Sequence, residues 1–307
     1  METETLTAFE HYLTDLDRSP LTVRGYLTDL AHFSHWFEQT NGEALRPERM
    51  TPTDVKEYKQ HLLLVERLKA STVNRHLAAI SAFASWAKQA GKIQSDPTDN
   101  VKSVKQVAAA PKWLDKNEQF SLQRAIERDL QLSKLRYPKR WLTRRRDASL
   151  TLFLLHTGLR LTELTAMRLG DVQFSERKGN VLVQNGKGGK QRDVPLNTDA
   201  RKAIQDWLAV RPATKSDLIW ISVESDSGSL SGRAIQRVFQ RYAQDAGLDA
   251  FTPHLARHTF AKNLVNNGVS LEKVAALLGH ANLNTTRLYI TPDKRDLGFA
   301  VEKLSQS

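Results

Sequence analysis

The chain has 307 residues, 40% of them hydrophobic, and no cysteine, which excludes a disulfide framework, a zinc–cysteine site and a thiol nucleophile. Its net charge is +11. Residues 1–107 hold 13 Lys and Arg against 14 Asp and Glu, whereas residues 108–307 hold 32 against 20. The basic excess therefore lies in the C-terminal two thirds of the chain, and it suits a polyanion such as nucleic acid. The N-terminus is acidic and lacks a signal-peptide run, and no apolar stretch approaches the roughly 20 residues that span a bilayer, so we expect a soluble, cytoplasmic protein with no membrane partner.

The first 100 residues predict a small helical domain. Ser/Thr-Pro pairs at residues 19–20 and 51–52 predict helix starts, because the hydroxyl caps free N–H groups and proline fits the first turn. Apolar residues then recur at helical spacing in three segments, residues 23–37, 55–62 and 73–87. The other faces of these helices offer four candidate phosphate contacts, with solvated surface as the alternative: Arg24, Lys69, Asn74 and Arg75.

Residues 101–111 are predicted to be a linker. They are the last part of the stretch DPTDNVKSVKQVAAAP, which has no apolar period and is bounded by prolines. Residues 112–307 then form a second, basic domain. A small helical domain tied to a larger basic one predicts a two-domain clamp that closes around a rod-like polyanion.

The first helices of the second domain carry the densest basic cluster of the chain, within the charged stretch 129–146. We interpret this cluster as a contact with the backbone of a nucleic acid, and an exposed, charged helix start is the alternative. Its members are Lys139, Arg140, Arg144, Arg145 and Arg146.

One segment of the second domain is not helical. The runs NVLVQ at residues 180–184 and QRDVPL at residues 191–196 enclose the glycine-rich NGKGGK, which predicts a β-hairpin. The run DLIWIS at residues 217–222 predicts a third strand. The remaining elements are predicted to be helices, at residues 233–246, 258–267 and 271–278, with a short last one that contains Tyr289.

Some charged residues of this domain stand where they need a partner. Arg160 follows the apolar run LLHTGL, and Glu163 lies one helical turn further on, where it can pair with an arginine. Lys187 stands among glycines at the tip of the hairpin, where a backbone can approach a ligand closely, and Lys190 at the end of the same loop is a further candidate DNA contact. The alternative for Arg160 and Glu163 is a structural ion pair, and the alternative for the two lysines is an exposed position without a ligand.

The last helices add imidazoles and a hydroxyl. His254 and Arg257 lie one turn apart near a helix start, which suits a phosphate, and His280 precedes Tyr289 by nine residues. His254 and His258 have the i, i+4 spacing of zinc ligands, but the glutamate of the HExxH motif is missing and no third ligand is evident. We therefore predict no metal site.

Together these residues supply cations, titratable imidazoles and one nucleophile in a fixed order. The four blocks that carry them resemble the tyrosine recombinases, which include Xer-type recombinases and phage and transposon integrases: TGLRLTEL, NGKGGKQRDVPL, PHLARHTFA and LLGHANLNTTRLY. The resemblance covers nearly the whole chain. It implies a mainly α fold with a small β-sheet in the C-terminal domain. Residues 1–100 would be a SAM-like core-binding domain, residues 112–307 the catalytic domain, and the tail 290–307 a contact between protomers.

The resemblance also implies the activity and the residues that carry it. The protein would be a site-specific recombinase that cuts and rejoins DNA through a 3′-phosphotyrosyl intermediate and a Holliday junction, in integration, excision or resolution. Tyr289 would attack the phosphate, His254 would accept its proton, and Lys187 would protonate the leaving 5′-oxygen. The implied catalytic residues are Arg160, Lys187, His254, Arg257, His280 and Tyr289, with Glu163 in support.

The implied partners are double-stranded DNA recombination sites and three further copies of the chain in a homo-tetramer. No cofactor or metal is implied, because arginines and a lysine do the electrostatic work often given to magnesium. The sequence departs from the family at Ala256, where many members have leucine, and in the length of the stretch 129–146. The alternatives are a type IB topoisomerase, which shares this chemistry, and a catalytically silent DNA-binding regulator.

Overall fold

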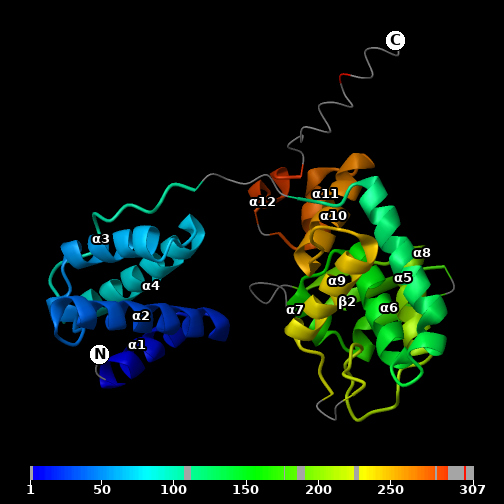
Figure 1. Cartoon of the computed structure of the whole chain (residues 1–307), viewed down its shortest axis with the longest axis horizontal. Helices are drawn as coiled ribbons and strands as arrows, with labels where there is room; N and C mark the ends of the chain where they lie inside the picture. Colours follow the sequence, from blue (N-terminus) through cyan, green and yellow to red (C-terminus); the bar gives the residue numbers. More distant parts are fainter. Residues whose placement is uncertain are drawn as a thin grey trace. The chain divides into compact units, whose positions relative to one another are not determined.

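The structure is a computed structural model, which describes residues 3–106, 112–175, 177–184, 191–224, 228–280, 282–289 and 301. The chain divides into two compact units, residues 1–108 and 109–307, and each is described by itself (Figure 1). The division falls within the stretch that the sequence predicts as the linker. No helix among the described residues is long and apolar enough to cross a membrane.

The first unit consists of helices, and both predicted helix starts are confirmed. The hydroxyl of Ser19 accepts a hydrogen bond from the backbone N–H of Thr22, and Thr51 forms a reciprocal capping box with Asp54. The apolar faces of these helices meet in one core that includes Phe33. In chain order the elements are α1 (Thr3–Asp15), α2 (Pro20–Asn41), η1 (Pro47–Arg49), α3 (Pro52–Gln60), the π-helical turn η2 (His61–Val65) and α4 (Ala70–Gln89).

Residues 101–106 lie against this first unit. Val101 and Val104 pack against its apolar core. The side-chain amide of Asn74 donates to the carbonyl of Val104 at 2.9 Å and accepts from its N–H at 2.7 Å. The first half of the predicted linker is therefore fastened to α4 by packing and by a pair of hydrogen bonds.

The second unit surrounds one helix, α6 (Trp141–Thr157), with others. The apolar residues of α6 do not keep to one face, because α5, α8, α9 and α10 all pack against it. Its last turn ends at Gly158, which adopts the left-handed conformation (φ 61°) that the turn requires. The helices of this unit are α5 (Lys116–Arg136), α6, α7 (Leu161–Ala166), the 3₁₀ turn η3 (Leu169–Asp171), α8 (Thr198–Leu208), α9 (Gly232–Ala246), α10 (Pro253–Asn266), α11 (Leu271–Leu278) and α12 (Asn284–Arg287).

A three-stranded antiparallel sheet completes the second unit, so the expectation of a mainly α fold with a small sheet is confirmed. The predicted hairpin is formed by β2 (Gly179–Val183) and β3 (Arg192–Pro195), with Val181 opposite Val194. The predicted third strand is wrong: residues 217–222 contribute only an isolated bridge at Leu218, and the third strand is β1 (Val172–Phe174), paired with β2. Three successive side chains, residues 219–221, are all buried, a pattern that a sheet with one solvent face does not produce.

Candidate active site

Glu163 is the centre of an ion-pair network at the start of α7. Its carboxylate accepts two hydrogen bonds from Arg192, at 2.9 and 2.8 Å, one from the Arg160 guanidinium at 2.8 Å and one from the Arg160 backbone N–H at 2.8 Å. Burial alone would raise the pKa of Glu163, but the hydrogen bonds from Arg192 and Arg160 outweigh it and lower that pKa to about 2. The Arg160–Glu163 pair that the spacing predicts is present. Sequence reasoning missed Arg192.

The C-terminal end of α11 gathers three arginines. The carbonyl of Leu277 accepts from Nε of Arg192 at 2.9 Å, that of Leu278 from Arg257 at 2.7 Å, and that of Gly279 from Arg160 at 2.8 Å. The last carbonyls of a helix lack partners within it and carry a partial negative charge. Three guanidinium groups can therefore lie close together here, immediately before His280.

Arg257 is the most deeply buried of the three, at 3% exposed. It also donates to the carbonyl of Gly158 at 2.7 Å, so it ties the end of α6 to the end of α11. Burial, followed by repulsion from Arg160, lowers the pKa of Arg257 to about 10, which leaves it charged at pH 7. A buried arginine charge beside a second one is a strong site for an anion such as phosphate.

Tyr289 lies beside these arginines. It is 2% exposed and packs with Ala261 of α10 and with α11. Its hydroxyl is 2.8 Å from Nδ1 of His258, and its carbonyl accepts from the ammonium of Lys262 at 3.4 Å. Burial raises the pKa of the phenol. The prediction that Tyr289 is inside the last short helix is wrong, because α12 ends at Arg287, two residues earlier.

Two further histidines flank this tyrosine and its partner. The ring of His280 stacks on Tyr289 with centroids 6.5 Å apart, and Nδ1 of His280 lies 2.9 Å from the hydroxyl of Thr286. The ring of His254 meets that of His258 edge to face at 4.8 Å. Burial, then the neighbouring arginines, lowers the pKa of His280 to about 4, and burial with Arg257 and Arg160 lowers that of His254 as well. Both shifts favour neutral imidazoles.

The structure thus brings together five of the six implied catalytic residues: Arg160, His254, Arg257, His280 and Tyr289. The sixth, Lys187, and the candidate DNA contact Lys190 lie outside the described residues. His258 and Arg192 join the site without having been assigned a role from sequence. His258 stands beside Arg257 in one of the four blocks, and Arg192 stands in QRDVPL within another. The signal that could have found them is a charged or titratable residue next to a buried position.

Some of the predicted DNA contacts are exposed side chains, and others already form hydrogen bonds or ion pairs within the protein. Asn74 holds Val104, and Arg75 makes two hydrogen bonds to Asp29, at 2.7 and 2.6 Å. Arg146 is 5% exposed and donates to Asp147 and to the carbonyl of residue 221, so it has no face left for DNA, which corrects its prediction as a contact. Arg144 and Arg145 are partly buried and paired with aspartates. Exposed side chains remain at Arg24, Lys69, Lys139 and Arg140.

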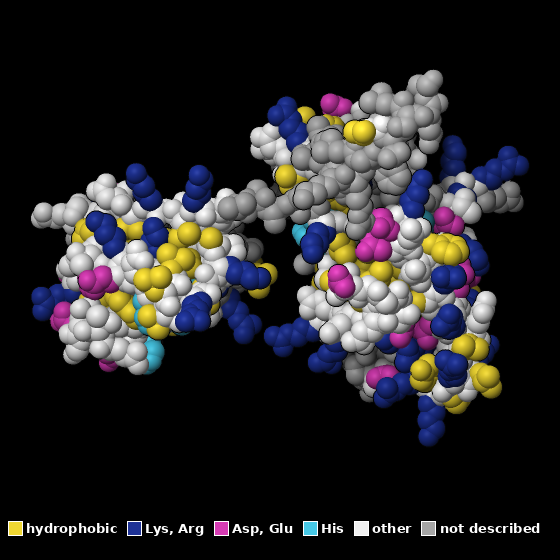
Figure 2. All heavy atoms as spheres, turned by 45° about the horizontal axis from the view of Figure 1, so that its top comes forward, with side chains coloured by type: hydrophobic (Ala, Val, Ile, Leu, Met, Phe, Trp, Pro, Cys, Tyr) yellow, Lys and Arg dark blue, Asp and Glu magenta, His cyan; other side chains and the backbone are white. Residues whose placement is uncertain are grey.

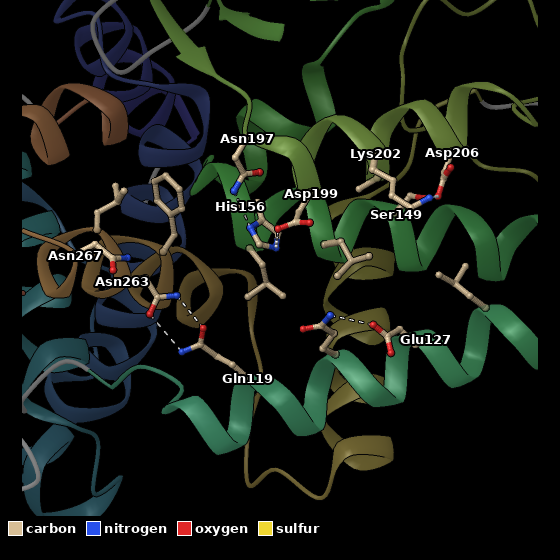
Figure 3. A pocket seen from close by; sticks show the side chains of 17 residues that line it. Gln119, Glu127, Ser149, His156, Asn197, Asp199, Lys202, Asp206, Asn263 and Asn267 are labelled. Atoms are coloured by element: carbon tan, nitrogen blue, oxygen red, sulfur yellow. Dashed lines mark hydrogen bonds and ion pairs between the residues drawn. The ribbon is translucent and has the colours of Figure 1, made fainter. Parts of the chain in front are cut away.

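Lys and Arg side chains stand out on the visible face of the second unit (Figure 2). A hollow of about 710 Å³ opens beside the catalytic cluster, and it is lined by Arg160, His254 and Arg257 together with residues of α9. A separate hollow of about 500 Å³ lies between α5, α6, α8 and α10 (Figure 3). Of the implied catalytic residues that the structure describes, none lines this second hollow, which we therefore set apart from the active site.

The chain matches two family models. Residues 130–295 match the phage integrase family, and residues 6–91 match the phage integrase N-terminal SAM-like domain. A tyrosine recombinase XerC of Corynebacterium glutamicum is 30% identical over 294 residues, which cover 96% of this chain and 89% of the relative. A TnP I resolvase of Bacillus thuringiensis is 27% identical over 301 residues, covering 96% of this chain and 98% of the relative.

Solved structures share the fold. The XerH site-specific recombinase, bound to palindromic difH substrate in a post-cleavage complex, superposes with a TM-score of 0.74 at 23% identity, covering 92% of this chain and 79% of that one. The Tn1549 transposon integrase, in complex with circular intermediate DNA, has a TM-score of 0.69 at 19% identity, covering 97% and 98%.

The fold and the site define a DNA strand-transferase of the tyrosine recombinase class. The chain belongs to the phage integrase family, and it is a site-specific recombinase that cleaves and rejoins DNA.

Proposed function

We propose that this recombinase cuts DNA through a covalent bond between Tyr289 and a phosphate held by Arg160 and Arg257. The observation that carries the proposal is the convergence of the buried phenol with these two arginines and His280 at one helix end. The planar guanidinium groups match the non-bridging oxygens and oppose the charge that builds up on them as the phosphorus is attacked. His280 adds a hydrogen bond to the same oxygens.

The proposed step balances as a transfer between oxygens. The phenolic oxygen of Tyr289 forms a bond to phosphorus, the bond from phosphorus to the 5′-oxygen breaks, and a 3′-phosphotyrosyl ester and a 5′-hydroxyl result. The phenol proton goes to His254, whose ring contacts that of His258, which in turn contacts the ring of Tyr289. Lys187 supplies the proton of the 5′-hydroxyl. A 5′-hydroxyl from a second duplex reverses the step, which joins the two DNAs and, after both strand pairs, resolves a Holliday junction.

A second part of the proposal concerns assembly. Two duplexes present four strands to cut, so four copies of the chain supply the four nucleophiles in a homo-tetramer on paired double-stranded sites in the cytoplasm. The tail 290–307, proposed to contact neighbouring protomers, lies outside the described residues except for Val301, which is 64% exposed. The mass of the complex on paired sites tests this stoichiometry.

The covalent step is tested with nicked duplexes of random sequence, from which a short 5′-hydroxyl fragment diffuses away after cleavage and leaves the adduct trapped. Wild-type protein is expected to form an SDS-stable adduct and to enrich one sequence. Tyr289→Phe is expected to form none. The matched control is Tyr242→Phe, which removes another buried hydroxyl, bonded to Asp129 at 2.8 Å, and keeps the adduct. An adduct that persists in Tyr289→Phe, or none with wild type, contradicts the proposal.

A further inference from the structure

His258 has no role in the mechanism proposed above, yet it touches the reacting atom. It follows Arg257 on α10, and its Nδ1 lies 2.8 Å from the hydroxyl of Tyr289. Within the described part of the chain, this imidazole is the hydrogen-bond partner of that hydroxyl. A buried tyrosine hydroxyl needs such a partner, and the partner decides where the hydroxyl points.

The direction of this hydrogen bond follows from the charges around it. Burial, then His254 and Arg257, lowers the pKa of His258 to about 4, so its ring is neutral at pH 7, while burial raises the pKa of the phenol. The phenol therefore donates and Nδ1 accepts, with the ring proton on Nε2. An imidazole in this state holds the phenol in its protonated form rather than removing its proton.

We propose that His258 is the positioning residue of the nucleophile: its Nδ1 accepts the hydrogen bond of the Tyr289 hydroxyl and fixes the direction in which the phenolic oxygen meets the phosphate. The inference rests on the proposed function of Tyr289. The apolar packing around Tyr289 fixes its ring, but only a polar neighbour fixes the hydroxyl. Misplacement of a reacting group by about 1 Å can cost on the order of 100-fold in rate.

Two substitutions separate positioning from proton acceptance. The side chain of His258→Asn can present an oxygen acceptor near the place of Nδ1 but does not titrate, whereas His258→Leu presents none. On the duplex enriched by wild type, we expect adduct formation to slow about 100-fold in His258→Leu and to stay within about tenfold of wild type in His258→Asn. The matched control is His156→Asn, which removes a histidine bonded to Asn197 in the hollow of Figure 3 and leaves the rate unchanged.

The result that overturns the inference is equally specific. A His258→Leu protein that binds the duplex and cleaves it at the wild-type rate removes any positioning role. If His258→Asn and His258→Leu both fold and form the adduct equally slowly, the imidazole acts as a proton acceptor and not as a positioning residue.

A measurement without DNA keeps the inference separate from the proposed function. In protein with ¹⁵N-labelled histidine, the Nδ1 signal of His258 is expected to shift when Tyr289→Phe removes the donor. No shift overturns the hydrogen bond itself. If wild type forms no adduct, the proposed function fails, while this comparison still reports on His258.

Discussion

At the scale of single residues, the site depends on one carboxylate that two guanidinium groups share. Glu163 is 8% exposed and accepts four hydrogen bonds, two of them from Arg192 and two from Arg160. Removing its charge would leave two partly buried arginines without an anion, which costs far more than the loss of one surface pair.

We therefore expect Glu163→Gln, which keeps the shape but not the charge, to destabilise the second unit by about 2–4 kcal/mol. Cleavage should fall as well, because Arg160 loses the partner that orients it. The matched control is Glu127→Gln, an exposed carboxylate on α5 bonded to Gln123, with an expected change within about 0.5 kcal/mol. Urea unfolding of both variants provides the measurement, and an equal midpoint for the two would contradict the shared-carboxylate account.

The residues that the sequence could predict are those whose spacing carries the information. One helical turn separates Arg160 from Glu163, and the pair forms as expected. Arg192 was missed because its partners, Glu163 and the end of α11, are far away in the sequence. Arg146 was misjudged for the same reason, since a run of three arginines does not reveal that one of them turns toward Asp147 and the interior.

At the scale of elements, the end of α11 is where the site is assembled. Gly279 follows this helix with φ 66°, a left-handed conformation that suits glycine, and a Cβ there would lie 2.9 Å from Nη1 of Arg192. The backbone conformation of Gly279 and the lack of space for a Cβ both affect the site, because the turn at Gly279 aligns the three carbonyls that accept hydrogen bonds from the arginines. The sequence could indicate a helix end at Gly279, but not that arginines from β3, from α10 and from the residue before α7 would meet there.

Gly279→Ala should therefore disturb the site beyond the cost of its backbone. Gly268→Ala is the matched control: it has φ 77° but nothing within 4 Å of a Cβ, so it carries only the backbone penalty of about 1 kcal/mol. We expect Gly279→Ala to lose at least 1 kcal/mol more, because Arg192 must shift, and to slow adduct formation about tenfold or more. Equal effects of the two substitutions on unfolding and cleavage would show that Arg192 tolerates the displacement.

At the scale of the whole molecule, the fold class could be predicted because helical periodicity and the hairpin glycines are local signals. The third strand could not, because β1 has only three residues and its pairing with β2 is set by the unit as a whole. The charge split predicts that a polyanion binds the second unit, and this unit also holds four histidines, of which His156, His258 and His280 are half-buried and His254 is exposed. Burial lowers the pKa values of His156, His254, His258 and His280.

These shifted histidines predict how the stability of the second unit depends on pH. The folded pKa values of His258 and His280 are about 4, below the unfolded value of about 6.5, so between these pH values the unfolded chain binds more protons than the folded one. Stability contributed by the neutral rings is complete above about pH 7 and is lost as pH falls through 6.5 toward 4. We expect a loss of about 1 kcal/mol for each of the two between pH 7 and 5.

Hydrogen exchange of the amides of α10 and α11, followed at constant ionic strength from pH 7 to pH 5 and corrected for intrinsic rates, measures this loss in the second unit alone. The variant His258→Asn cannot titrate at that position, so its stability should fall by about 1 kcal/mol less than that of wild type over the same interval. A wild type whose protection in α10 and α11 does not change from pH 7 to pH 5 would mean that these histidines charge as easily when folded as when unfolded. The neutral imidazole that His258 must offer to Tyr289 would then be absent at the acid end of the range, and the positioning of the nucleophile would fail there first.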